Sequence, residues 1–265
     1  MNRLQGRSGF TLVELAIVLV IIGLLVGGVL VGQDLIKAAT VRSTVADIEK
    51  ANAAATTFRT KYSGLPGDLL STRATEYGLL TATGRTGAAG MGDGNGLIEG
   101  CSAGAVTLGC ESALFWVDLS TAALIPQKLA TYAAATTFVA DQTTSAGVSS
   151  FLPKQKLRDT AFLDAYTANG RNYFYLGGAT ASTSGVLTLA AAVTPGEARS
   201  IDDKFDDAFP TTGVVTSVTA LGTVDAGTTQ TSSTCMNGTA SPKVYNVIDA
   251  NINNVNCMIA LRTNF

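Results

Sequence analysis

Histidine is absent from the 265-residue sequence, and charged residues make up only 14% of it. The absence of histidine removes the side chain that most often acts as a general base and commonly binds zinc. The Gly-x-Ser-x-Gly pattern of many serine hydrolases occurs once, at residues 100–104 (GCSAG), but without a histidine the chain lacks the base of a Ser-His-Asp triad. We therefore expect no enzyme, and we expect any bound metal to use oxygen ligands.

Long basic runs are also lacking, and the formal net charge is −2. Proteins that bind nucleic acids usually carry a basic surface, so we expect no nucleic-acid partner. The glycine-rich stretch GRTGAAGMGDGNGLIEG (Gly84–Gly100) contains no lysine. It is therefore not a phosphate-binding P-loop.

A long apolar segment occupies residues 10–32, and its only charged residue is Glu14. As a helix it would be about 34 Å long, close to the ~30 Å hydrocarbon core of a membrane. Arg3 and Arg7 precede it, and this charge bias predicts a cytoplasmic N-terminus with the bulk of the chain exported.

The helical pattern continues beyond the apolar segment, up to the stop signal SGLP at residues 63–66. Residues at the spacing of one helix face are Leu35, Ala38, Val41, Val45, Ile48, Ala51, Ala55, Phe58 and Tyr62. We predict one helix from about Phe10 to Tyr62. Small residues in VGGVLVGQDLIKAA also allow an ordinary cleaved signal peptide, although a continuing helix favours a retained anchor.

The stretch RSGFTLVEL resembles the processing site of type IV prepilins and type II secretion pseudopilins. In this family a dedicated aspartic peptidase cleaves between the glycine and the phenylalanine, then methylates the new N-terminus. The resemblance implies a leader at residues 1–9, cleavage between Gly9 and Phe10, and N-methylation of Phe10. It also implies that Glu14 pairs with the new amino group of a neighbouring subunit during assembly. The alternative is that Glu14 reaches the membrane surface from near the helix start.

The rest of the chain predicts an α+β fold. We predict a helix at Glu111–Ile125 and a second helix that starts at the capping box Thr194–Glu197 and ends before Pro210. The predicted strands lie in NYFYLGG, GVLTLAAAV, VVTSV, KVYNVI and NCMIALR. We predict a long N-terminal helix, half transmembrane and half amphipathic, packed on an antiparallel β-sheet with Gly/Thr-rich loop insertions. Residues 10–32 would be the transmembrane and assembly helix, and residues 33–265 the exported pilin-like domain. We interpret Asp202, Asp203, Asp206 and Asp207 as a solvated helix face.

Four cysteines allow three pairings. We favour Cys101–Cys110 and Cys235–Cys257, because each pair is close in sequence and closes a short loop. Four free, buried thiols are the alternative for a chain that is not exported.

The stretch DGNG resembles the opening of a calcium loop, with Asp93, Asn95 and Glu99 as oxygen ligands. Leu97 occupies the place of the next expected ligand, and Asn-Gly is also a strong turn signal. Both a calcium loop and a plain turn therefore stay open. Calcium is the only cofactor that the sequence suggests.

The resemblance implies a structural subunit of a type IV pilus or a type II secretion pseudopilus. Its partners would be copies of itself, other pilin-like subunits, prepilin peptidase and an inner-membrane assembly platform. It would sit in the bacterial inner membrane with its bulk in the periplasm, and then enter a periplasmic or extracellular filament. The alternative is a membrane-tethered, pilin-like binding module for a surface ligand or DNA that does not polymerise.

Overall fold

The computed structural model describes residues 11–79, 92–99, 111–129, 148–183, 186–218, 235–237, 243–248 and 254–265. The chain divides into two compact units, Met1–Thr40 and Val41–Phe265. We call them the N-terminal unit and the C-terminal unit. The first helix, α1 (Leu12–Tyr62), contributes residues to both.

The 51 residues of α1 confirm the predicted long helix. It ends at Tyr62 because Ser63 adopts a positive φ of 55° and donates its N–H to the Arg59 carbonyl. In the C-terminal unit, the buried side chains of α1 recur at helical spacing: Val41, Thr44, Ile48, Ala51, Ala54, Ala55, Phe58 and Tyr62. This half of α1 is therefore amphipathic, as predicted.

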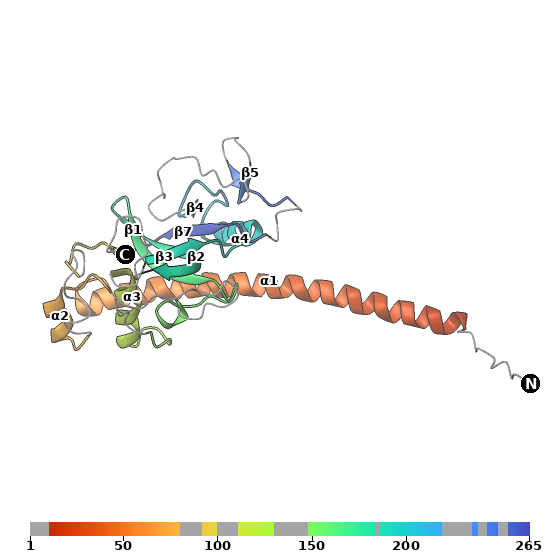
Figure 1. Cartoon of the computed structure of the whole chain (residues 1–265), viewed down its shortest axis with the longest axis horizontal. Coiled ribbons are helices and arrows are strands. Elements are labelled where there is room, and N and C mark those ends of the chain that lie inside the picture. The colour runs from red at the N-terminus through yellow and green to blue at the C-terminus, as the bar shows by residue number, and fades with distance from the viewer. Residues whose placement is uncertain are drawn as a thin grey trace, which may run out of the picture. The chain divides into compact units, whose positions relative to one another are not determined.

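The main sheet has the strand order β1-β2-β7-β4, and β3 also pairs with β2 (Figure 1). The strands are β1 (Phe162–Ala168), β2 (Arg171–Thr183), β3 (Val186–Ala190), β4 (Val215–Val218) and β7 (Met258–Arg262), and every pairing is antiparallel. Asn169 and Gly170, both at positive φ, form the tight turn of the β1–β2 hairpin. A smaller sheet pairs β5 (Met236–Asn237) with β6 (Val244–Tyr245). The predicted α+β fold with an antiparallel sheet is confirmed.

The described part of the C-terminal unit also contains four shorter helical elements: α2 (Ser71–Glu76), α3 (Glu111–Thr121), the 3₁₀ turn η1 (Val148–Ser150) and α4 (Pro195–Phe205). An aromatic cluster joins α3 to the sheet, since the Phe115 ring lies 5.9 Å from Phe174 and 5.7 Å from Phe265. Trp116 is buried and donates its indole N–H to the carboxylate of Asp164. The only tryptophan is therefore a core residue.

Helix α3 ends four residues before the predicted Ile125. The Ser120 hydroxyl donates to the Gln127 carbonyl and accepts from the Leu129 N–H, which folds the chain back past the helix end. Ala123 has a positive φ of 56°, which a continuing helix does not allow. The apolar residues that suggested a longer helix thus belong to the following turn.

The predicted Cys235–Cys257 disulfide is present, with 5.1 Å between the two Cα atoms. Cys257 also pairs through its backbone with Val193, next to the start of α4. The bridge therefore ties the segment before β5 to the residue before β7, whose backbone pairs with the segment between β3 and α4. The predicted Cys101–Cys110 pair lies outside the described residues.

The interpretation of four aspartates as a solvated face is wrong for Asp202. Its side chain is buried, and it accepts hydrogen bonds from the Tyr245 hydroxyl at 2.8 Å and the Ala208 N–H at 3.2 Å. Burial is the main cause that raises the pKa of Asp202 to about 7. Asp203, by contrast, is 66% exposed. The reason is that Asp202 shares the buried face of α4 with Ala198 and Ile201.

Candidate functional site

Glu14 lies in the first turn of α1 and forms a capping box with Thr11. One carboxylate oxygen, Oε2, accepts from the Thr11 N–H at 2.8 Å and from the Thr11 hydroxyl at 2.9 Å. The Thr11 hydroxyl accepts in turn from the Glu14 N–H at 3.3 Å. The Thr-x-x-Glu pattern in TLVE is the sequence signature of this box, and our sequence analysis missed it.

The capping box gives Glu14 a partner within its own chain before any assembly. Its second oxygen, Oε1, has no hydrogen-bond partner among the residues that the structure describes. The carboxylate is therefore held in one orientation with one oxygen free to accept from another molecule. Gly9 and Phe10, the predicted processing residues, lie outside the described residues.

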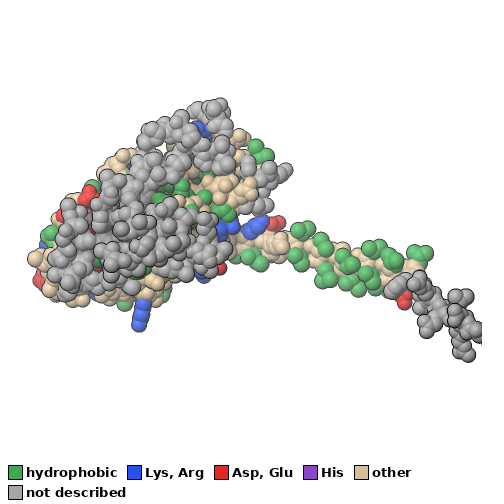
Figure 2. Space-filling model, in the orientation of Figure 1, with side chains coloured by type: hydrophobic (Ala, Val, Ile, Leu, Met, Phe, Trp, Pro, Cys, Tyr) green, Lys and Arg blue, Asp and Glu red, His purple; other side chains and the backbone are tan. Residues whose placement is uncertain are grey.

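The helix that carries Glu14 is long and apolar enough to cross a membrane. One 18-residue window of α1 has a mean hydropathy of 3.0, and none of it is buried. Figure 2 shows hydrophobic side chains along this part of α1. Leu24, for example, is 73% exposed. Such a surface needs lipid or another apolar surface to cover it, which fits membrane anchoring.

A second candidate site is a group of three acidic side chains in the C-terminal unit. Oxygens of Asp68, Asp93 and Glu111 all lie within 4.8 Å of one another. Asp68 comes from the turn between α1 and α2, Asp93 from the loop at residues 92–99, and Glu111 from the first residue of α3. Asp68 and Glu111 are buried, whereas Asp93 is exposed.

The two buried carboxylates hold the backbone of the 92–99 loop. Asp68 accepts from the N–H groups of Gly94 at 2.7 Å and Gly96 at 2.8 Å. Glu111 accepts from the N–H groups of Gly92 at 2.7 Å and Glu99 at 2.8 Å. The loop is therefore ordered around the acids by four hydrogen bonds to their carboxyl oxygens.

Glycine at position 67 is needed for this arrangement. Gly67 has a φ of +84°, and a Cβ atom there would collide with the backbone carbonyl of Glu111. The Gly67 N–H also donates to the buried carboxylate of Asp118 on α3 at 2.8 Å. Close approach of the turn to α3 is what brings Asp68 and Glu111 together.

Burial is the main cause that raises the pKa of Asp68 to about 6 and that of Glu111 to about 8. The backbone N–H donors lower both pKa values but do not offset the lost hydration, and the neighbouring acids raise them further. Three carboxyl groups so close together favour either bound protons or a bound cation. Their oxygen donors fit a hard divalent cation such as calcium.

The predicted Asp93, Asn95 and Glu99 also lie together, because the Asn95 side chain contacts the other two, but this set differs from the acidic group. Only Asp93 belongs to the acidic group. Asn95 donates its amide N–H to Asp93 at 3.0 Å and to Glu99 at 3.3 Å, while its carbonyl oxygen accepts from the Leu97 N–H. Asp68 and Glu111 are distant from the loop in sequence, so ligand spacing could not reveal them. Calcium binding itself stays a prediction.

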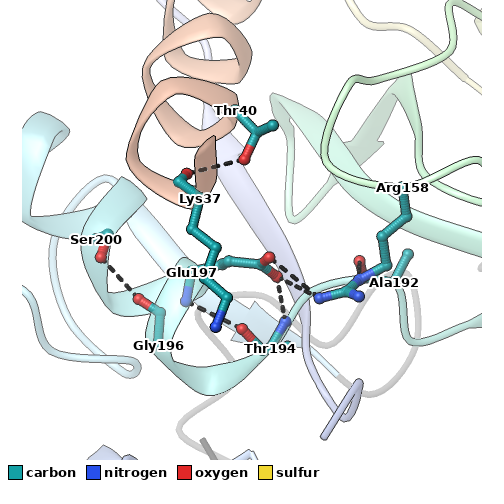
Figure 3. A network of polar contacts seen from close by, with 8 residues as sticks. All are labelled: Lys37, Thr40, Arg158, Ala192, Thr194, Gly196, Glu197 and Ser200. Atoms are coloured by element: carbon teal, nitrogen blue, oxygen red, sulfur yellow. Dashed lines mark hydrogen bonds and ion pairs between the residues drawn. The ribbon is translucent and has the colours of Figure 1, made fainter. Parts of the chain in front are cut away.

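A separate polar network fixes the start of α4 (Figure 3). Thr194 and Glu197 form the predicted capping box. Arg158 donates to both carboxylate oxygens of Glu197, at 3.1 and 2.8 Å, and to the Ala192 carbonyl at 3.1 Å. The contact with Glu197, in which the single nitrogen Nη2 donates to both oxygens, is partly buried and links the segment before β1 to α4. We assign it a structural role.

Residues 4–30 match the family model of the prokaryotic N-terminal methylation motif. The match covers RSGFTLVEL, Thr11 and Glu14 of the capping box, and most of the apolar part of α1. It supports a type IV pilin-like or pseudopilin-like protein. Neither a curated protein nor a solved structure matches the chain.

Proposed function

We propose that the chain is a structural subunit of a type IV pilus or a type II secretion pseudopilus, and not an enzyme. One observation carries the proposal: the methylation motif opens an unburied apolar helix half, and the same helix continues into the core of a folded unit. A pilin-like subunit needs this combination, because the apolar half must first lie in lipid and later pack against other helices.

In this proposal, prepilin peptidase removes residues 1–9 and methylates Phe10. The processed subunit then stays in the inner membrane until assembly, with its N-terminus in the cytoplasm and the C-terminal unit in the periplasm. An assembly platform transfers it into a filament of its own copies and other pilin-like subunits. The Oε1 atom of Glu14 would accept from the new amino group of a neighbour, which offsets the cost of a carboxylate in an apolar environment.

The experiment that tests the proposal is mass spectrometry of the intact protein from cells with and without prepilin peptidase. We expect a chain that starts at N-methylated Phe10 when the peptidase is present, and an unprocessed chain when it is absent. A chain that starts near Gln33 in both strains would mean ordinary signal cleavage. That outcome would remove Glu14 from the mature protein and contradict the proposal.

A further inference from the structure

A polar cleft of about 620 Å³ lies in the C-terminal unit, where α1 ends. Four parts of the chain form its walls: the last turns of α1 with the following turn, α2, the 92–99 loop and the segment that ends at Phe265. It is distinct from the acidic group described above, although Asp68 borders both. Two arginines, Arg59 from α1 and Arg73 from α2, contribute to its lining.

The charges of these two arginines are not used within the described part of the chain. The Arg59 side chain has no hydrogen bond or ion pair with any described residue. Arg73 uses one nitrogen, Nη1, to donate to the Ser63 carbonyl at 3.2 Å, and this contact fixes its position without neutralising it. Most N–H donors of both guanidinium groups are therefore available to a ligand.

The one acidic residue that lines the cleft does not pair with either arginine. Both carboxylate oxygens of Asp68 accept from backbone N–H groups of the 92–99 loop. Neither guanidinium charge is therefore neutralised by an ion pair with a described residue that lines the cleft. Guanidinium groups match carboxylate and phosphate oxygens in a two-point geometry, which favours an anion of this kind.

The remaining wall supplies apolar surface. Leu70, which is 44% exposed, borders the cleft together with Phe265, whereas the other lining leucines, Leu65 and Leu69, are buried in the fold. A ligand that combines an anionic group with a compact carbon body would place the first on the arginines and the second against this wall. We propose that the cleft binds a small organic anion, namely a carboxylate or a phosphate ester, a property beyond filament assembly.

The test is isothermal titration calorimetry on the full chain in detergent. The probes are inorganic phosphate, glucose 6-phosphate, glucuronate and uncharged glucose. We expect glucose 6-phosphate or glucuronate to bind and glucose not to bind. Arg59→Gln should weaken that binding by about tenfold or more, because it removes charge-assisted hydrogen bonds. Which of the two probes binds distinguishes a phosphate ester from a carboxylate.

Arg199→Gln is the matched control. Arg199 is exposed on α4 and does not line the cleft, so the substitution removes the same charge outside it. It should leave binding unchanged. Arg73→Gln should also weaken binding. Because Arg73→Gln also removes the hydrogen bond to the Ser63 carbonyl and can disturb α2, Arg59→Gln is the variant that decides the test. Binding of no organic anion, or equal weakening by Arg59→Gln and Arg199→Gln, would overturn the proposal. Light scattering on the same variants measures self-association. If Arg59→Gln changes self-association and no organic anion binds, the cleft contacts a second copy of the chain, and the proposal is overturned.

Discussion

At the scale of single residues, Glu14 combines two properties that usually occur separately. It caps the first turn of α1 through Oε2, and it leaves Oε1 without a partner among the described residues. The first property stabilises the helix in every state of the protein. The second matters only when another subunit approaches. Substitutions can separate the two, because charge and hydrogen-bonding capacity are different features of the side chain.

Glu14→Gln keeps an oxygen that accepts the Thr11 N–H but removes the charge. Thr11→Ala keeps the charge but removes the hydroxyl of the capping box. If charge pairing drives assembly, Glu14→Gln should reduce filament incorporation strongly, and Thr11→Ala should reduce it much less. Immunoblotting of sheared filament fractions against membrane fractions measures this. The reverse order of effects would show that capping, and not charge, is the function of Glu14.

Buried acids are the residues that our sequence reasoning misplaced. Helical spacing from Ala198 and Ile201 puts Asp202, and not its exposed neighbour Asp203, on the buried face of α4, but four nearby aspartates favoured a solvated face. Asp68 and Glu111 are separated by the glycine-rich stretch and meet only because Gly67 lets the turn approach α3. Such contacts depend on tertiary packing, whereas the Thr-x-x-Glu box at Thr11 was readable from four adjacent residues.

At the scale of elements, the start of α4 shows how local sequence and tertiary contact reinforce each other. The Thr194 hydroxyl accepts from the Glu197 N–H, and the Glu197 carboxylate accepts from the Thr194 N–H and from Arg158. We predict that Thr194→Ala lowers the free energy of unfolding by about 1 kcal/mol. The melting temperature should fall by roughly 2–4 °C.

Ser200→Ala is the matched control for this prediction. Ser200 is exposed on the same helix, and its hydroxyl donates only to the Gly196 carbonyl within α4 (Figure 3). Ser200→Ala should lower the melting temperature, measured by circular dichroism, by less than Thr194→Ala does. Equal shifts in the two variants would mean that the capping box adds nothing beyond an ordinary hydroxyl contact.

The Cys235–Cys257 bridge gives a second prediction for the elements. Both cysteines are buried, so labelling must be done in denaturant without reductant. We expect neither cysteine to react with a thiol reagent in protein purified from an exporting cell. The double variant Cys235→Ser with Cys257→Ser should lose about 2–4 kcal/mol of stability. Labelling of both residues in the wild-type protein would contradict the bridge.

The elements themselves were predictable to different degrees. Helix α1 and the start of α4 carry strong local signals, namely a long helical period, a stop signal and a capping box, and both were predicted closely. The end of α3 was not, because apolar residues after Thr121 pack in a turn that Ser120 stabilises. Strand β2 continues to Thr183, beyond the predicted Gly178, because it pairs with β1, β3 and β7 in turn.

At the scale of the whole molecule, the pKa values of the buried acids link stability to pH. The folded-state pKa of Glu111 is about 8, above its ordinary 4.5, and that of Asp68 is about 6, above its ordinary 3.8. The folded protein therefore binds these protons more tightly than the unfolded chain does. The stability that these protonated acids contribute is fully present below their ordinary pKa values. It is lost as the pH rises through about 6 for Asp68 and about 8 for Glu111. Asp164 and Asp202, whose pKa values burial raises to about 7, act in the same direction.

A cation at Asp68, Asp93 and Glu111 would reverse this dependence locally, because it binds the ionised carboxylates and competes with protons. We predict that, in chelator, the melting temperature falls between pH 5 and pH 8. We also predict that millimolar calcium raises it more at pH 8 than at pH 5, since ligand binding stabilises the folded state. Asp93→Asn should abolish the calcium effect and keep the backbone hydrogen bonds of the two buried acids, although it should lower their pKa values because the Asp93 charge helps to raise them. Asp203→Asn, which removes an exposed acid on α4, is the control and should keep the effect. A calcium shift equal at both pH values, or unchanged in Asp93→Asn, would leave the 92–99 loop as a plain turn held by protonated acids.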